Sequence, residues 1–257
     1  MDTPIFDTHA HYDDEAFDED REELLKSLAE NGIARVVNVA ASLRSCETSL
    51  ELARRYPFIY TAIGVHPSET APLKPSDIGR LREWCADPKC VAVGEIGLDY
   101  YWPEPDASIQ KEWFFRQLEL ARELQKPVII HSRDACRDTI EICREQKAGE
   151  IGGVIHCYSY SAESAKAFLD MGFFFGIGGV LTFKNARKLV ETVEYLPMDR
   201  IVIETDSPYL APVPNRGKRN SSLNLPYVVK SLSQIKGIAE EEVRRITWEN
   251  ACRLYRI

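Results

Sequence analysis

The sequence has no long apolar run and no basic patch at its N-terminus. Its longest apolar stretches have only the length of a β-strand, whereas a membrane-spanning helix needs about 20 apolar residues. The first residues, Met1-Asp2-Thr3-Pro4, carry no lysine or arginine of the kind that begins a secretion signal. We therefore expect neither export nor membrane contact, and a cytoplasmic monomer is the default expectation.

Paired cysteines and an excess of positive charge are also missing. The seven cysteines are an odd number without a Cys-x-x-Cys pair, which favours reduced thiols over a disulfide framework. The net charge is −8 and the isoelectric point is near 5.3, which argues against a protein that coats nucleic acid through a broad basic surface. An enzyme that binds a polynucleotide end locally remains compatible with this charge, because bound divalent cations would add positive charge.

Several catalytic motifs are absent as well. The chain has no P-loop and no evident Ser/His/Asp arrangement, and Gly176-Ile177-Gly178-Gly179 is only a weak glycine cluster rather than a dinucleotide fingerprint. Covalent catalysis by a side chain is therefore disfavoured, and an activated water is preferred.

The sequence does contain eight short runs rich in valine and isoleucine, with helical spacing between them. This alternation is typical of a parallel sheet covered by helices. A closed (β/α)8 barrel of the TIM type fits the count and the length better than the alternative, an open doubly wound sheet. We predict one domain over residues 1–257, with strands at Pro4–Thr8, Ile33–Val39, Ile59–Gly64, Val91–Glu95, Pro127–His131, Gly153–His156, Phe173–Ile177 and Ile201–Thr205.

The helices are expected between and after these strands, and one loop is unusually long. The Pro-rich, basic segment Ser207–Asn220 follows the last strand and is long enough to be functional. The predicted helices are Asp20–Asn31, Ser108–Gln125, Arg133–Gln146, Ala162–Met171, Leu223–Lys236 and Ala239–Leu254.

All the histidines lie at or just after predicted strand ends. Acidic residues hold similar places, because Glu95 closes the fourth strand and Asp206 follows the eighth. In a parallel barrel these ends meet at one face, where active sites lie. The five histidines are His9, His11, His66, His131 and His156.

A set of six residues has the chemistry of a metal centre. In His9-Ala10-His11 the spacing of two places both imidazoles on one side of an extended segment. Nitrogen and oxygen donors suit Zn²⁺, Mn²⁺, Mg²⁺, Co²⁺ or Ni²⁺, and six ligands exceed the need of one catalytic ion, so we predict two divalent ions. The predicted ligands are His9, His11, Glu95, His131, His156 and Asp206.

Three further residues are assigned supporting roles. By strand alternation Asp7 lies beneath His9 and Glu204 lies beneath Asp206. Both are expected to support ligands, with a buried salt bridge as the alternative. His66 has no other candidate ligand on its strand, so we expect substrate contact or proton transfer there, with a structural role as the alternative.

Aromatic and basic residues surround the predicted centre. Aromatic rings could stack on bases, and guanidinium or ammonium groups could hold phosphates. Core aromatics and solvated charges are the alternative interpretation. The candidates are Tyr100, Tyr101 and Trp102 after Glu95, Arg133 after His131, and Arg216, Lys218 and Arg219 in the long loop.

These residues stand in motifs that resemble the TatD-like metal-dependent deoxyribonucleases, a family of the metal-dependent hydrolase superfamily, over nearly the whole chain. The matching motifs are FDTHAH at Phe6–His11, GVHP at Gly64–Pro67, GEIGLDY at Gly94–Tyr100, PVIIHSRDA at Pro127–Ala135, HCYS at His156–Ser159, ETDSPYLAP at Glu204–Pro212 and RGKRN at Arg216–Asn220.

The resemblance implies a TIM barrel with a divalent-metal centre and assigns its ligands. His9, His11, Glu95 and Asp206 would bind one ion, and His131 and His156 the other, with Glu95 bridging both. The family's activities are DNA cleavage, often 3′ to 5′ on single strands, and in some members removal of D-amino acids from tRNA.

Our preferred function is a 3′ to 5′ exonuclease on the ends of single-stranded DNA. Asp206 would take a proton from a water activated by the two ions, and His66, Arg133 and the loop 216–219 would hold the phosphate. The alternatives are a D-aminoacyl-tRNA deacylase, a small-molecule amide or ester hydrolase, and a non-catalytic binding protein. Related small-molecule hydrolases often use a carboxylated lysine where this chain has Glu95, and a binding protein would be expected to have lost ligands.

Overall fold

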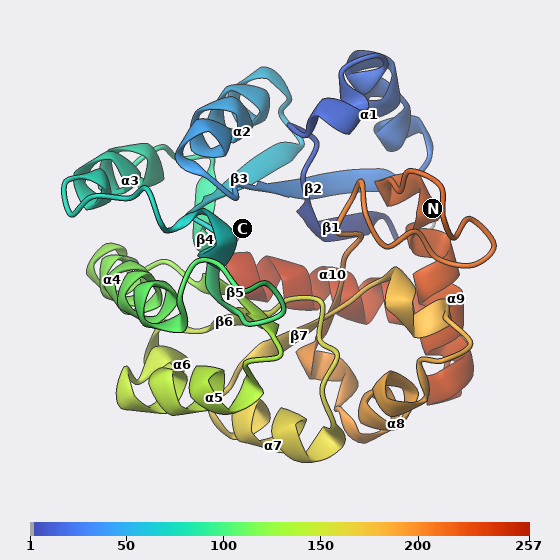
Figure 1. Cartoon of the computed structure of the whole chain (residues 1–257). Coiled ribbons are helices and arrows are strands. Elements are labelled where there is room, and N and C mark those ends of the chain that lie inside the picture. The colour runs from blue at the N-terminus through green and yellow to red at the C-terminus, as the bar shows by residue number, and fades with distance from the viewer. Residues whose placement is uncertain (1–2) are drawn as a thin grey trace.

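The computed structural model describes residues 3–257 and contains one sheet of eight strands. Neighbouring strands pair in parallel in the order β1 to β8, and an isolated bridge between Ala10 and Ser207 joins the last strand region to the first. The closed (β/α)8 barrel predicted from the sequence is confirmed (Figure 1). The strands are β1 (Ile5–Ala10), β2 (Ile33–Val39), β3 (Ile59–Ile63), β4 (Cys90–Asp99), β5 (Val128–Arg133), β6 (Gly153–Ile155), β7 (Phe174–Ile177) and β8 (Ile201–Ile203).

Helices surround this sheet, and α10 lies across one end of the barrel (Figure 1). Between residues 3 and 257, no helix combines the length and apolar composition that crossing a membrane needs. The helices are α1 (Arg21–Glu30), α2 (Leu43–Arg55), α3 (Asp77–Cys85), α4 (Ala107–Leu124), α5 (Cys136–Glu145), α6 (Ala148–Ile151), α7 (Ala162–Asp170), α8 (Arg187–Tyr195), α9 (Leu225–Lys236) and α10 (Glu240–Tyr255), with short 3-10 turns η1 (Glu15–Phe17), η2 (Pro67–Glu69), η3 (Gly179–Thr182), η4 (Met198–Arg200) and η5 (Ser222–Asn224).

The helices begin and end where the sequence supplies caps. The side chains of Ser42, Asp106 and Ser161 accept from backbone N–H groups in the first turns of α2, α4 and α7. Gly237 ends α9 with a φ of 67°, a conformation that costs glycine nothing.

The interior of the barrel has an apolar floor below its functional end. Ile129, Val154 and Val202 belong to the buried cluster that contacts α10. They stand two residues before His131, His156 and Glu204. Because side chains two apart on a strand share a face, the apolar floor lies one layer beneath these polar residues.

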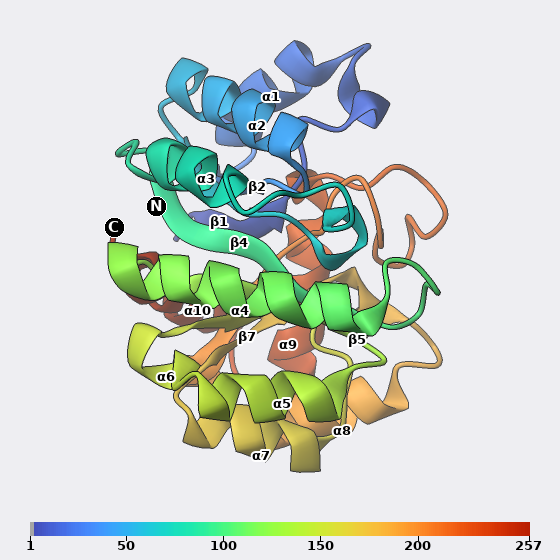
Figure 2. The ribbon, with the colours of Figure 1, turned by 60° about the vertical axis from the view of Figure 1, so that its left-hand side comes forward.

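Three strands run further than predicted, and the first of them is β1, which ends at Ala10 instead of Thr8. β4 continues from Cys90 to Asp99 instead of ending at Glu95, and its pairing with β5 shifts register between Val93 and Ile96. Arg133 ends β5, and α5 begins only at Cys136. The loops after β4 (residues 100–106) and after β8 (residues 207–220) project from the same end of the barrel (Figure 2).

Candidate metal centre

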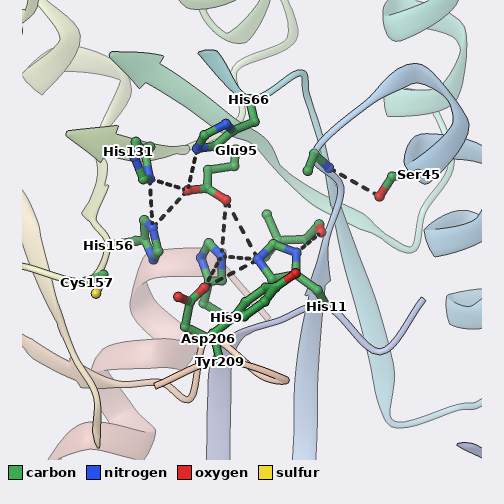
Figure 3. A network of polar contacts seen from close by, with 12 residues as sticks. His9, His11, Ser45, His66, Glu95, His131, His156, Cys157, Asp206 and Tyr209 are labelled. Atoms are coloured by element: carbon green, nitrogen blue, oxygen red, sulfur yellow. Dashed lines mark hydrogen bonds and ion pairs between the residues drawn. The ribbon is translucent and has the colours of Figure 1, made fainter. Parts of the chain in front are cut away.

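Four of the predicted ligands meet on the β1 and β8 side of the site (Figure 3). His9 Nε2 lies 3.1 Å from His11 Nε2 and 3.4 Å from Glu95 Oε2. Asp206 Oδ1 lies 3.4 Å from His11 Nε2 and 3.7 Å from His9 Nε2. Donors that share one ion at a bond length of about 2.1 Å stand roughly 3 to 4 Å apart, so these distances, and the 3.8 Å between His11 Nε2 and Glu95 Oε2, fit a common metal ion.

The hydrogen bonding of His11 suits a metal ligand. Its Nδ1 lies 2.7 Å from the carbonyl oxygen of Val39, which can only accept, so Nδ1 donates. In the neutral ring the lone pair is then on Nε2, the atom that faces His9 and Asp206. A histidine ligand typically donates its other N–H to such an oxygen.

A second group of donors meets at the other oxygen of Glu95. Glu95 Oε1 lies 2.7 Å from His131 Nδ1 and 2.8 Å from His156 Nε2, and the two ring nitrogens are 3.3 Å apart. The two oxygens of Glu95 therefore face different sets of donors. This is the arrangement that a carboxylate bridging two ions requires.

Asp99 supports the second group and was missed in the sequence analysis. Its Oδ2 lies 3.1 Å from His131 Nε2, which donates because the carboxylate accepts. The lone pair of the neutral ring is thus on Nδ1, directed at Glu95. Such facing acceptors need a proton or a metal ion between them.

The pKa shifts describe the same electrostatics. Although burial raises the pKa of Glu95, the neighbouring rings of His156 and His9 hold it well below its usual range. Burial lowers the pKa of His11, but Asp206 and Glu95 outweigh it and raise the pKa to about 9. Burial also lowers the pKa of His156, but Glu95 and Glu204 outweigh it and raise this pKa well above its usual value. Protons therefore occupy His11 and His156 at neutral pH, and divalent ions would displace them.

Glu204 and Asp7 contact the ligands in different ways. Glu204 Oε1 lies 3.6 Å from His156 Nδ1 and accepts from the backbone N–H of Cys157. A Cβ added to Gly176 would stand 2.1 Å from Glu204 Oε2, so a glycine leaves the space for this carboxylate.

Asp7 reaches only the backbone of His9, whose N–H it accepts at 3.2 Å. It also accepts from the hydroxyls of Thr205 and Ser222 at 2.7 and 2.6 Å. Burial outweighs these hydrogen bonds and raises the pKa of Asp7 to about 7. Within residues 3–257 no lysine or arginine pairs with Asp7 or Glu204, so the salt-bridge alternative has no partner there.

His66 presents a hydrogen-bond donor to the site. Its Nδ1 accepts from the backbone N–H of Ser68 at 3.2 Å, so the proton of the neutral ring is on Nε2. That Nε2 lies 3.9 Å from Glu95 Oε1, and burial lowers the pKa of His66 to about 3. His66, Asp99 and His131 form a third group of close donors, but both ring Nε2 atoms carry protons, so this group does not suit a third ion.

An open cavity of about 910 Å³ lies over this centre. Its wall contains five carboxylates and a single arginine, Arg133, whose guanidinium lies 3.7 Å from the centre of the Tyr101 ring. The lining residues are His11, Asp13, Asp14, Ala41, Ser45, His66, Glu95, Asp99, Trp102, His131, Ser132, Arg133, His156, Cys157, Ser159, Val180, Asp206, Tyr209 and Leu210.

The other predicted substrate contacts lie away from this lining. The Tyr100 hydroxyl donates to Asp138, because this tyrosine turns towards the neighbouring helices. Arg219 pairs with Asp20 at 2.5 Å. The remaining three are also outside the lining: Tyr101, whose ring contacts Arg133, Arg216, which lies 4.4 Å from the Phe183 ring centre, and Lys218.

A closed parallel barrel with histidines and carboxylates at the carboxyl ends of its strands defines a class, the metal-dependent hydrolases built on the (β/α)8 fold. The family model described as TatD related DNase matches residues 6–256. The chain belongs to the TatD family and is a metal-dependent hydrolase.

Named relatives cover nearly its whole length. The chain is 42% identical over 253 residues to the uncharacterized metal-dependent hydrolase YabD of Bacillus subtilis, covering 98% of this chain and 99% of YabD. It is 38% identical to the uncharacterized metal-dependent hydrolase YcfH of Escherichia coli K12, covering 98% and 96%. The solved structure of YjjV, a TatD homolog from Escherichia coli K12, superposes with a TM-score of 0.94 at 28% identity and covers 100% of both chains.

Proposed function

We propose that this hydrolase cleaves phosphodiester bonds at the 3′ ends of single-stranded DNA. The observation that carries the proposal is the bridging position of Glu95, with one oxygen in each donor group, beneath a cavity wide enough for a nucleotide. The description of the matching family as a related DNase supports the same substrate class. Two divalent ions of open identity are part of the proposal.

The site residues divide the work of hydrolysis. When bound, two ions would lower the pKa of a water and neutralise charge on the phosphate. Asp206 is the base that orients this water and takes its proton, and its carboxylate is ionised at neutral pH because, although burial raises its pKa, His11 and His156 hold that pKa below the usual value. Glu95 holds the two donor groups in register.

Substrate contacts come from donors on the wall of the cavity. His66 Nε2 carries a proton and faces the centre, so it donates a hydrogen bond to a phosphate oxygen. Arg133 lines the cavity and supplies a guanidinium for a second phosphate. The loop residues Arg216, Lys218 and Arg219 and the ring of Tyr100 would need to move to reach a substrate in the cavity.

The experiment is hydrolysis of 3′-labelled and 5′-labelled single-stranded oligonucleotides by metal-reconstituted protein, with Glu95→Ala as the control. Stepwise shortening from the 3′ end that disappears in Glu95→Ala supports the proposal. Deacylation of a D-aminoacyl-tRNA or hydrolysis of a small ester, without DNA cleavage by the metal-loaded wild type, would overturn it. The cytoplasmic location and monomeric state stay predictions.

A further inference from the structure

The cavity wall next to β1 is acidic. Asp13 accepts hydrogen bonds from Asn38, Ser45 and Thr48 at 2.7 to 3.0 Å. These donors are neutral, so they satisfy the carboxylate without cancelling its charge. Asp13 also lines the cavity, so this charge acts on whatever occupies it.

Asp14 extends this acidic wall across to the loop after β8. Its Oδ2 accepts from the Tyr209 hydroxyl at 3.0 Å, and its Oδ1 accepts from the backbone N–H of Ala16. Both Asp14 and Tyr209 line the cavity. The guanidinium of Arg21 donates to the backbone oxygens of Asp13 and Asp14 and pairs with Asp18, so it does not pair with the carboxylate of Asp14.

The opposite wall, between β4 and β5, is aromatic and basic. Arg133 stacks on Tyr101, and the ring centres of Tyr101 and Trp102 are 4.8 Å apart. Trp102 lines the cavity and is 54% exposed, so its ring is available to a base, whereas Tyr101 lies outside the lining and packs against Arg133. Within residues 3–257 Arg133 has no carboxylate partner.

Asp99 connects this aromatic wall to the metal centre. Its Oδ1 accepts from the backbone N–H of Tyr101 at 3.0 Å, while its Oδ2 accepts from His131. The acidic wall in turn adjoins His11, which lines the cavity beside Asp13 and Asp14. The two donor groups therefore lie between walls of opposite character.

We propose that this asymmetry orients the DNA strand and selects the chemistry of its end, an inference that rests on the proposed function. The strand leaves over Trp102 and Arg133, which hold the penultimate base and its phosphate. The terminal nucleotide faces Asp14 and Tyr209. A 3′-hydroxyl end is accepted there, because a hydroxyl can donate to the acidic wall, whereas a 3′-phosphate end is repelled.

The chemistry of the cut agrees with this selection. A water oxygen bonds to phosphorus, the bond from phosphorus to the 3′-oxygen of the penultimate nucleotide breaks, and that oxygen takes up a proton. The products are a nucleoside 5′-monophosphate and a strand shorter by one nucleotide. The shortened strand again ends in a 3′-hydroxyl, so every cycle regenerates the end that the acidic wall accepts.

The test compares two oligonucleotides of the same sequence, one ending in a 3′-hydroxyl and one in a 3′-phosphate. The ratio of their kcat/KM values is measured for wild type and for Asp14→Asn, which keeps an oxygen to cap Ala16. Asp14→Asn removes one negative charge near the doubly charged 3′-phosphate. It should therefore reduce the kcat/KM preference for the hydroxyl end by on the order of fivefold at physiological salt, and by more at low salt. Glu15→Gln, at an exposed carboxylate outside the lining, is the matched control and should keep the wild-type ratio.

Binding gives a second readout that does not depend on turnover. An oligonucleotide with a 3′-hydroxyl should quench tryptophan fluorescence in wild type, and Trp102→Phe should remove most of this change. An identical hydroxyl-to-phosphate ratio in wild type and Asp14→Asn, or unchanged quenching in Trp102→Phe, would overturn the inference. Absence of DNA cleavage by every variant would instead count against the proposed function.

Discussion

Replacing Asp99 should weaken one half of the metal centre without altering a ligand. Asp99 is 3% exposed, and its carboxylate can only accept, so it holds the proton of the neutral His131 ring on Nε2. The lone pair of Nδ1 is then directed at the site, 2.7 Å from Glu95 Oε1. Without Asp99 the ring is free to adopt the other tautomer, which presents N–H instead of a lone pair.

The size of the effect follows from this geometry. Loss of a carboxylate that orients a histidine ligand typically costs about 10- to 100-fold in metal affinity, or about 1.4 to 2.7 kcal/mol. Asp99→Asn keeps an amide oxygen that can still accept from His131, so we expect the lower part of this range. Asp99→Ala keeps no acceptor and should reach the upper part.

The assay is a titration of metal-free protein with Zn²⁺ in competition with a chromophoric chelator, which resolves two sites. Only the site that contains His131 should weaken, while the site of His11 and Asp206 should change by less than about twofold. Asp138→Asn, at a carboxylate that binds Tyr100 outside the cavity, is the control. If Asp99→Ala bound Zn²⁺ at both sites with the affinity of wild type, the reasoning would be refuted. Equal weakening of both sites would show that Asp99 acts through the fold.

Three other predictions concern residues around the same centre. Asp206→Asn should lower kcat by about 10³-fold or more while circular dichroism and the melting temperature stay close to wild type, and retained turnover would remove Asp206 from the role of base. His66→Gln, which keeps an N–H donor, should have a kcat/KM about tenfold higher than that of His66→Ala, whereas equal values for the two variants would contradict a donor role. His11 has a folded pKa of about 9, raised above its unfolded value, so in metal-free protein its stabilising contribution is complete below about pH 6.5 and is lost as pH rises through 9. Because ions compete with this proton, the affinity of the His11 site should rise by up to about tenfold per pH unit between pH 7 and 9, and an affinity that is flat over this range by calorimetry would disprove the raised pKa.

The sequence could predict the barrel and the convergence of the candidate ligands because both depend on local patterns. Valine-rich runs define strands, and in a parallel barrel the residues after them are brought to one end regardless of their separation in the chain. His9 and Asp206 are far apart in sequence, yet their backbones bond directly, since Asp206 N–H donates to the His9 carbonyl. No knowledge of helix packing was needed to place them together.

The missed residues depend on departures from regular strands and on side-chain direction. Asp99 was overlooked because β4 was expected to end at Glu95, whereas a register shift lets it continue through the next four residues. The direction of Tyr100 could not be read from its position, because Asp138, on α5, supplies the partner of its hydroxyl. Arg219 similarly pairs with Asp20, which precedes α1 and is distant in sequence. Such pairings require the three-dimensional arrangement of neighbouring helices.

The charge of the cavity links metal binding to substrate binding. In its lining, five carboxylates outnumber Arg133 and the protonated rings of His11 and His156, and the whole chain carries a net charge of −8, so the metal-free cavity does not attract a phosphodiester. A protein of this kind cannot concentrate DNA by general attraction, as basic nucleic-acid-binding proteins do. Under the proposed function, attraction for DNA is therefore local, and it depends largely on the ions held by the donor set that supports the chemistry. Under the proposed function, removing the ions should accordingly weaken DNA binding as well as turnover, since Arg133 and the protonated rings of His11 and His156 do not outnumber the surrounding carboxylates.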